Sequence, residues 1–534
     1  MKRLITAGAL LAVVGLALSG TPVSETTPDG PAARGFPGIG SIAAGSGNGS
    51  FRFGVSSSAT QIEDRNPNTD WYRWTAPKPE GLAKSPFVGD AAGGYTRALA
   101  DVELIAKLGV DSYRFGIEWA RIEPRRDVID EAALAHYDRF IDALLERGIR
   151  PMVTVHHFAS PIWVDDPADV DCAKRPGDAN LCGLDHPKGG RLVVAEMAEH
   201  ARLLADRYGD RVDEWVTVNE PMGYMTFSHA FGVGPPGKAN LDPEKLPRFT
   251  AALRSYLDAH AAMYRMLKKH DRIDADGDGV AAAVGLTTGA QDYVPVRDGK
   301  ISADPRDVAA RDRFRDYFDF KFVDAIWKGR FDADLDGHWE ERQPQWRGTL
   351  DWLGPQLYAR QGVHDPAQTP DQPAYPVIDV GFCSDAPCLP VEDESYWVPT
   401  MGYHASPQGL HRILTETAER YPGLPLVVTE SGIATRSGTR RAEHLVRALE
   451  QIERVRAEGV DVRGYYHWAL MDNFEWLAGY PPRFGLYEVD RTTLARRPTE
   501  AVDVYARITA ARDVSTADRQ RYGGDGPLSP EPAS

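Results

Sequence analysis

Short apolar runs alternate with longer amphipathic stretches through most of the chain, from residue 51 to residue 512. The short runs are rich in β-branched and aromatic residues, as buried strands are, and the longer stretches have helical spacing. Strands are predicted at 51–57, 112–117, 152–156, 214–219, 280–286, 350–356, 426–430 and 464–469. Helices are predicted at 94–107, 131–147, 191–208, 245–269, 305–328, 407–420, 440–458 and 499–512. This alternation predicts an α/β fold, a single (β/α)8 TIM barrel with long βα loops.

The two ends of the chain have a different composition from the barrel region. Lys2 and Arg3 precede an apolar run at 4–18 that is too short to span a bilayer comfortably, and small residues follow it. We therefore expect a secretory signal peptide at 1–20 and a secreted, extracellular protein. Residues 21–48 are rich in Gly, Ser, Thr and Pro and are predicted to be a flexible linker. The barrel domain is expected at 49–515, followed by a disordered tail at 516–534.

The four cysteines form two close pairs, Cys172 with Cys182 and Cys383 with Cys388. In an exported protein, such pairs predict two local disulfides. Metal binding is the alternative, although neither pair has the spacing of a zinc knuckle. Each pair falls in one of two long stretches, near 165–190 and 360–401, which follow the third and sixth predicted strands. Long loops at these places are typical of substrate-binding lids.

The charge of the chain limits its partners. The formal net charge of the 534 residues is −16, which argues against binding to nucleic acid or to an anionic membrane surface. No segment after residue 20 is apolar enough to cross a membrane, so no membrane span is expected. A small-molecule partner is therefore favoured, and the oligomeric state stays open.

Two predicted strands end on a glutamate. The strand 214–219 leads into Asn219-Glu220-Pro221, and the strand 426–430 ends at Glu430. Placing a carboxyl group at the end of a buried strand is costly, and barrel enzymes place their catalytic groups there. A pair of ion-pairing structural glutamates is the alternative. Two such glutamates on one rim fit a retaining glycosidase, in which one carboxylate attacks the anomeric carbon and the other transfers a proton.

These motifs resemble glycoside hydrolase family 1, the retaining β-glucosidases and β-galactosidases, over about residues 51–512. The segment 215–221, Trp-Val-Thr-Val-Asn-Glu-Pro, resembles the family's acid/base motif, and Thr429-Glu430-Ser431-Gly432 resembles its nucleophile motif. The resemblance implies that Glu220 is the acid/base, that Glu430 is the nucleophile and that Arg114 supports Glu430. The family usually has Asn at the position of Ser431.

The resemblance also implies a set of sugar-binding residues. Phe158 stands where the family usually has Trp, and Gln356-Leu357 stands where it usually has Asn-Tyr. A carboxylate at Glu475 disfavours substrates with a 6-phosphate, because like charges would meet. The expected substrate-binding residues are Gln61, His157, Asn219, Tyr358, Trp468, Glu475 and Trp476.

Two acidic segments resemble the first half of a calcium loop. Asp274, Asp276 and Asp278 alternate before Gly279, and the segment 332–337 has the same pattern. The twelfth positions are Gly285 and Gln343, which cannot supply the closing bidentate carboxylate. We expect solvated acidic turns, with a structural calcium at Asp274, Asp276 and Asp278 as the alternative. No other cofactor is expected.

The sequence therefore predicts a secreted, cofactor-independent β-glycosidase that hydrolyses terminal β-D-glucosides, or galactosides and fucosides, through a covalent glycosyl-enzyme. One alternative is a transglycosylase that uses the same two glutamates with a sugar or alcohol acceptor. Another is a non-catalytic glycan-binding barrel, which is disfavoured because both Glu220 and Glu430 are present.

Overall fold

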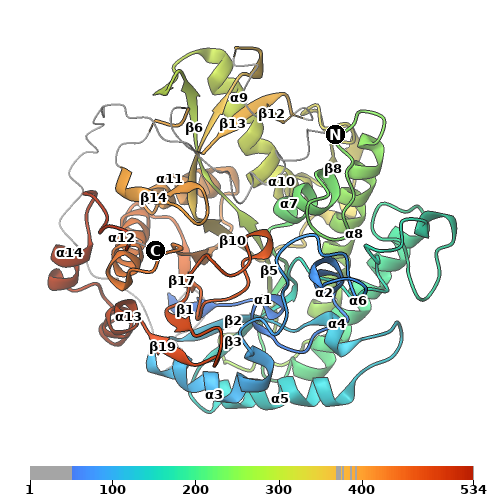
Figure 1. Ribbon diagram of the computed structural model, residues 1–534, viewed down its shortest axis with the longest axis horizontal. Helices are drawn as coiled ribbons and strands as arrows, with labels where there is room; N and C mark the ends of the chain where they lie inside the picture. Colours follow the sequence, from blue (N-terminus) through green and yellow to red (C-terminus); the bar gives the residue numbers. More distant parts are fainter. Residues whose placement is uncertain (1–50, 369–373, 376–377, 385–387, 391–393, 533–534) are drawn as a thin grey trace.

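Eight parallel strands close into a barrel in the computed structural model, which describes residues 51–368, 374–375, 378–384, 388–390 and 394–532. The order around the barrel is β1-β17-β16-β10-β5-β4-β3-β2, and helices surround it (Figure 1). The predicted fold class is confirmed, whereas the predicted signal peptide and linker lie outside the described residues. The barrel strands are β1 (Arg52–Ser56), β2 (Ser112–Gly116), β3 (Arg150–His156), β4 (Glu214–Val218), β5 (Ala283–Gly289), β10 (Trp352–Leu357), β16 (Leu426–Ser431) and β17 (Val462–Trp468).

Most of the longer helices pack their apolar faces on the outside of the barrel, whereas α9 (Pro305–Arg315) packs against the strands at 292–297 and 359–364 above it. The longer helices are α3 (Gly94–Lys107), α5 (Glu131–Leu145), α6 (Gly189–Tyr208), α8 (Leu246–His270), α9, α10 (Lys321–Lys328), α11 (Gly409–Arg420), α12 (Gly438–Ala457) and α13 (Glu500–Ala511). Shorter helices α1 (Ala59–Ile62), α2 (Asp70–Thr75), α4 (Trp119–Ile122) and α7 (Pro221–Tyr224) lie in the connections. No helix within the described residues combines the length and the apolar character needed to span a bilayer.

The predicted boundaries lie within two residues of the observed ones except in two elements. The fifth barrel strand was expected at 280–286 but occupies Ala283–Gly289, because its pairing with β4 begins only at Ala283. The helix expected at 305–328 is divided into α9 and α10 by a π-helical turn at Asp316–Phe320. A second π-helical turn, Met225–Ala230, follows α7.

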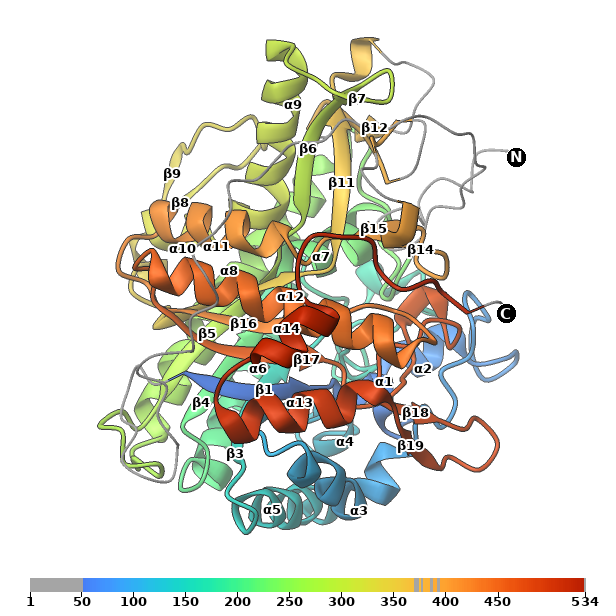
Figure 2. The ribbon, with the colours of Figure 1, turned by 90° about the vertical axis from the view of Figure 1, so that its left-hand side faces the viewer.

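A second sheet is built from the loops after β5 and β10. It contains β6 (Asp292–Arg297), β7 (Lys300–Ile301), β11 (Ala359–His364), β12 (Ala374–Tyr375), β13 (Val380–Cys383), β14 (Trp397–Val398) and β15 (Tyr403–Ala405). Figure 2 shows β6 and β11 standing above the barrel strands. Asp292 fixes this sheet, since its carboxylate accepts hydrogen bonds from Arg360 and Ser406, each at 2.7 Å, and from Arg412. Two small hairpins, β8 (Arg330–Phe331) with β9 (Glu341–Arg342) and β18 (Tyr487–Val489) with β19 (Arg496–Pro498), complete the strands.

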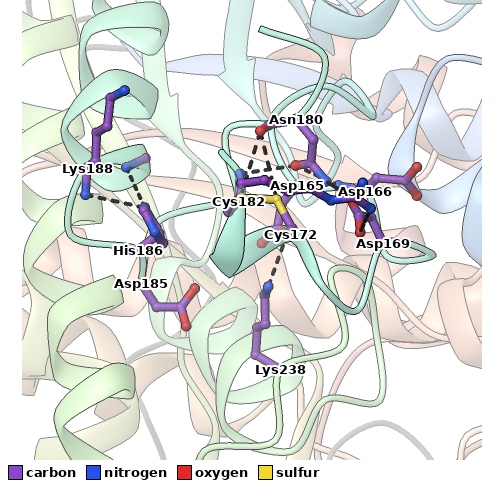
Figure 3. The surroundings of a disulfide bond; sticks show 12 residues. Asp165, Asp166, Asp169, Cys172, Asn180, Cys182, Asp185, His186, Lys188 and Lys238 are labelled. Atoms are coloured by element: carbon purple, nitrogen blue, oxygen red, sulfur yellow. Dashed lines mark hydrogen bonds and ion pairs between the residues drawn. A yellow bond between two sulfur atoms is a disulfide. The ribbon is translucent and has the colours of Figure 1, made fainter. Parts of the chain in front are cut away.

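Both predicted disulfides are present, so the four cysteines are not metal ligands. The bond between Cys172 and Cys182 lies in the loop after β3 (Figure 3). Asn180 stabilises this loop by accepting a hydrogen bond from the amide of Cys182 at 3.0 Å, and Lys238 pairs with Asp165 at 3.1 Å. These contacts hold the long loop against the barrel rim.

The segment after residue 515, predicted as a disordered tail, is ordered through residue 532. It contains α14 (Thr516–Tyr522), which begins with Ser515 accepting a hydrogen bond from the amide of Asp518 at 3.1 Å. Leu528 is 3% exposed, although its neighbours are Gly, Pro and Ser. The prediction was wrong because the composition of 523–534 matches that of a linker, whereas buried contacts with distant helices hold the chain in place.

Candidate active site

A cleft opens at the carboxyl ends of the barrel strands and encloses about 840 Å³, including space open to solvent. This is the face of a barrel that carries catalytic residues. Nine of the residues predicted for the site line it, namely Gln61, His157, Asn219, Glu220, Tyr358, Glu430, Trp468, Glu475 and Trp476. The tenth, Arg114, is fully buried behind Glu430. The structure therefore brings all ten together from seven barrel strands or the residues that follow them.

Glu220 is placed by the sharp turn that follows β4. Its backbone is in the left-handed region with a φ of 38°, and its amide donates a hydrogen bond to the carbonyl of Thr287 at 3.0 Å. Left-handed backbone is costly for a residue with a side chain, and such strain concentrates at functional sites. Pro221 then starts α7, where its missing N–H is tolerated. This turn directs the carboxyl group of Glu220 into the cleft.

Glu430 is held by two direct hydrogen bonds. Arg114 donates to its Oε1 at 2.5 Å, and the hydroxyl of Tyr358 donates to its Oε2 at 2.6 Å. Such charge-assisted bonds favour an ionised carboxylate. No described residue donates a hydrogen bond to the carboxyl group of Glu220. The two glutamates therefore share one cleft and have different environments.

The difference between the environments determines which glutamate carries a proton. Burial and the nearby charge of Glu430 raise the pKa of Glu220 to about 8. Burial also raises the pKa of Glu430, but Arg114 and the hydrogen bond from Tyr358 oppose that rise. At neutral pH the shared proton therefore resides on Glu220, and Glu430 is the charged member of the pair. This arrangement provides one protonated carboxyl group and one charged carboxylate in the same cleft.

Asn219 is oriented by three donors. Its Oδ1 accepts hydrogen bonds from Arg114 at 2.6 Å, from Thr287 at 2.8 Å and from Gln356 at 3.1 Å. Because the oxygen is occupied, the amide nitrogen is the group left to act as a donor in the cleft. Gln356, which departs from the family pattern, also donates to Thr429 at 3.2 Å. The substitution thus keeps a polar side chain linking β10 to β16 and to the turn after β4.

The far end of the cleft carries a pair of hydrogen-bonding groups and aromatic rings. Nε2 of Gln61 lies 3.3 Å from Oε2 of Glu475. Burial and the charge of Glu430 raise the pKa of Glu475 to about 8. The rings of Trp468 and Trp476 lie 6.1 and 6.0 Å from that of His157. Polar groups beside aromatic rings that line a cleft are suited to binding a sugar.

His157 is neutral and lies against these rings. Burial, together with the charge of Arg114, lowers the pKa of His157 well below its usual value. Its Nδ1 has no hydrogen-bond partner among the described residues. By contrast, the neighbouring His156 bonds to Tyr256 at 2.8 Å and to Ser160 at 3.1 Å, as a core residue would.

Several residues of the cleft carried no signal in the sequence. Phe227 and Phe318 lie on the two π-helical turns, where an aromatic residue in a helical pattern indicates only core packing. Gly289 is invisible to motif analysis, yet a Cβ atom there would lie 3.0 Å from Cδ of Glu220. Met401 and Tyr403 come from the long loop after β10. Only the folded arrangement of the loops reveals their position.

The calcium candidates lie at the opposite end of the barrel, among arginines. Asp276 forms an ion pair with the buried Arg150, and Asp278 lies 3.9 Å from Arg52. Asp274 instead accepts hydrogen bonds from the amides of residues 278 and 279, at 3.0 and 2.9 Å. Positive side chains from β1 and β3 thus already face two of the three carboxylates.

A closed barrel with two glutamates at the strand ends of one cleft defines a barrel glycoside hydrolase. The sequence model of glycosyl hydrolase family 1 matches residues 47–514, and the chain belongs to this family. The chain is therefore a glycoside hydrolase of the β-glycosidase type, as the resemblance implied.

Relatives span nearly the whole domain. The chain is 31% identical over 519 residues to a β-galactosidase of Pyrococcus woesei, a match that covers 87% of this chain and 97% of the relative. It is also 31% identical over 500 residues to a bifunctional β-D-glucosidase/β-D-fucosidase of Bifidobacterium breve, covering 86% and 97%. Among solved structures, it is similar to a β-glycosidase from Pyrococcus horikoshii with a TM-score of 0.73 and 29% identity, covering 89% and 97%.

Proposed function

We propose that the chain hydrolyses terminal β-D-glucosides with retention of configuration, and that β-galactosides and β-fucosides are secondary substrates. The observation that carries the proposal is the unequal environment of the two glutamates, in which Arg114 and Tyr358 contact Glu430 but not Glu220. A retaining enzyme needs this inequality, because one carboxylate must attack while the other donates a proton.

The proposed reaction has two displacements. A carboxylate oxygen of Glu430 attacks the anomeric carbon, the glycosidic bond breaks, and Glu220 gives its proton to the departing oxygen. Glu220, now a carboxylate, takes a proton from water, whose oxygen attacks the anomeric carbon and releases Glu430. These steps use two carboxyl groups and water, so the proposed reaction requires no cofactor.

Sugar recognition is assigned to the remaining predicted residues. Asn219 would donate to the hydroxyl next to the anomeric carbon, and Gln61 with Glu475 would bind hydroxyls at the far side of the ring over Trp468. His157 and Trp476 complete this subsite. A 6-phosphate is disfavoured because its negative charge would enter a buried part of the cleft that is close enough to Glu430 to feel the charge of that carboxylate. The relatives named β-galactosidase and β-D-glucosidase/β-D-fucosidase support a subsite that accepts related sugars.

The test is a panel of aryl β-glycosides offered to the wild type and to Glu430→Ala. We expect wild-type turnover, fastest with the glucoside, and a loss of at least about 10⁴-fold in the variant. Glu458→Ala, at the exposed position directly after α12, is the matched control and should turn over like the wild type. Equal rates for Glu430→Ala and the wild type would refute the assignment.

Transglycosylation is the second candidate for the same glutamate pair. Phe227, Phe318 and Met401 line the cleft and give it an apolar portion in which an acceptor other than water could bind. Product analysis with an added alcohol separates the two reactions. Free sugar as the main product supports hydrolysis, and a predominant alkyl glycoside supports transfer.

Secretion is proposed from the N-terminal sequence together with the two disulfides, which persist in oxidising compartments. N-terminal sequencing of protein recovered from outside the producing cells tests it. We expect a start near residue 21, and an intact Met1 on protein retained inside the cells would contradict the proposal.

A further inference from the structure

Residues 523–532, the last that the structure describes, form what we call the C-terminal strap. It lies beyond residues 47–514, which the family model matches. Figure 2 shows the chain leaving α14, arching upward and passing β14 before it ends. The strap therefore connects the outer helices of the barrel with the loops that surround the cleft.

Polar contacts fix the strap to α12. The guanidinium of Arg447, which is 4% exposed, donates hydrogen bonds to the carbonyls of Gly526 at 2.6 Å and Pro527 at 3.2 Å. Ser529 donates through its amide and its hydroxyl to the two carboxylate oxygens of Glu443, at 2.7 and 2.6 Å. Both partners belong to α12, so the strap has a defined course along this helix.

Leu528 packs on the back of the cleft wall. It is 3% exposed and belongs to an apolar cluster with Met401, Tyr403, Trp468 and Phe484. All four of these neighbours line the cleft. The cluster thus contains both residues that line the cleft and one residue of the strap, Leu528.

The strap also contacts two of the loops that carry cleft residues. The amide of Leu528 donates to Ser395, just before β14, at 2.8 Å. Glu531 accepts hydrogen bonds from the amide of Arg436 at 2.8 Å and from the hydroxyl of Thr435. Thr435 lies five residues after Glu430 on the same connection. One short segment therefore joins the loop after β10 to the loop after β16.

We propose that the C-terminal strap is a positioning element of the substrate cleft, with Leu528 holding the wall formed by Trp468, Tyr403 and Phe484. Truncating a buried leucine leaves a void into which its neighbours partly relax. Here the cluster that contains Leu528 includes four cleft residues, so relaxation within it displaces the surface that contacts the sugar. The inference rests on the proposed use of this cleft by the substrate.

The effect should fall on binding more than on chemistry. Glu220, Glu430 and Arg114 are outside the Leu528 cluster, and their hydrogen bonds do not involve the strap. Tyr358, the hydroxyl donor to Glu430, packs against the cluster but is not one of its buried members. A displaced wall weakens contacts that are made equally in the ground state and in the transition state, which raises KM and leaves kcat unchanged.

The experiment compares Leu528→Ala with Leu424→Ala in the full chain. Leu424 is 7% exposed in the main core, outside the cleft cluster, so it is a matched leucine truncation. KM and kcat are measured for an aryl β-glucoside at a temperature at which circular dichroism shows all variants folded. We expect Leu528→Ala to raise KM about fivefold with kcat changed less than twofold, and Leu424→Ala to leave both unchanged. Leu528→Met, which conserves volume, should restore KM.

Two outcomes would overturn the inference, namely a folded Leu528→Ala with the wild-type KM and a Leu424→Ala that raises KM equally. If Leu528→Ala does not fold, Glu531→Ala is the deciding variant, because it removes the strap's contacts to Thr435, Arg436 and Arg440 at a partly exposed position. A raised KM in that variant supports the strap, and a wild-type KM refutes it. The proposed function is tested separately by whether the wild type turns over the β-glucoside. The role of the strap is tested by the KM of each variant relative to the KM of the wild type.

Discussion

Arg114 donates a hydrogen bond to Oε1 of Glu430 at 2.5 Å across the interior of the barrel, from β2 to β16. The guanidinium is fully buried, and a second nitrogen donates to Asn219 at 2.6 Å. One rigid group thus fixes both the proposed nucleophile and the proposed donor to the sugar. Lysine has the same charge but lacks the planar fork of donors that makes both contacts possible.

Arg114→Lys should therefore lower kcat by about 100-fold, a loss similar to that of one preorganised donor in an active site. Steady-state kinetics with an aryl β-glucoside measures it. The matched control is Arg121→Lys, because Arg121 also pairs with a buried glutamate, Glu63, but outside the cleft. Comparable kcat values for the two variants would show that the geometry at Arg114 does not matter.

The pH dependence of the reaction follows from the pKa of Glu220, which burial and the charge of Glu430 raise to about 8. Below that pH the carboxyl group is protonated and can act as the acid, and above it the proton is lost. We expect kcat/KM to reach a plateau just below pH 8. Above pH 8, we expect it to fall about tenfold per pH unit.

Glu475 also has a pKa of about 8, so the alkaline decline alone does not identify the group that loses its proton. Comparing the pH profiles of substrates with good and poor leaving groups separates Glu220 from Glu475. A phenol that departs without protonation needs no acid, and its alkaline decline should be weaker if Glu220 causes it. An identical decline for good and poor leaving groups would assign the loss to Glu475 or to another group.

The sequence was sufficient to predict the barrel and the two glutamates, because apolar strands that each end on a glutamate are a local pattern. It could not predict the conformation of residues 516–532. Leu528 stands among Gly, Pro and Ser, and it is buried in a cluster with residues such as Trp468 and Tyr403, which are distant in the chain. The cleft residues Phe227 and Phe318 were missed because a π-helical turn has no recognisable sequence pattern.

Gly289 is a further residue that only the structure identifies. A Cβ atom there would lie 3.0 Å from Cδ of Glu220 and 3.1 and 3.2 Å from its two oxygens, so Gly289→Ala must displace the carboxyl group. We expect kcat to fall about tenfold with little change in melting temperature, since misplacing a catalytic group by a fraction of an ångström impairs proton transfer.

Gly223→Ala is the matched control on the other side of Glu220. Its nearest contact to the carboxyl group would be 3.4 Å, which is ordinary van der Waals distance. Both variants add one methyl group beside the same side chain, so a general effect of crowding would lower kcat equally in both. A loss confined to Gly289→Ala supports the positional argument.

The acidic loop at 274–279 is expected to stabilise the barrel through arginine and not through a metal. Asp276 pairs with Arg150, which is 4% exposed and otherwise lies 3.7 Å from Glu214. Asp276→Asn leaves a buried guanidinium with weaker compensation, and we expect the free energy of unfolding to fall by about 3 kcal/mol. Asp274→Asn, at an exposed position on the same loop, should change it by less than about 0.5 kcal/mol.

Thermal unfolding with and without a chelator separates this account from a calcium site. A bound ion stabilises the folded state by mass action, so its removal by the chelator would lower the melting temperature. If Asp274 and Asp276 were its ligands, replacing either one would abolish the effect of the chelator on the melting temperature. With arginine as the partner, the chelator leaves the melting temperature of the wild type unchanged, and only Asp276→Asn is destabilised. A chelator-dependent shift that vanishes in Asp274→Asn would establish the ion and make the Arg150 pair secondary to it.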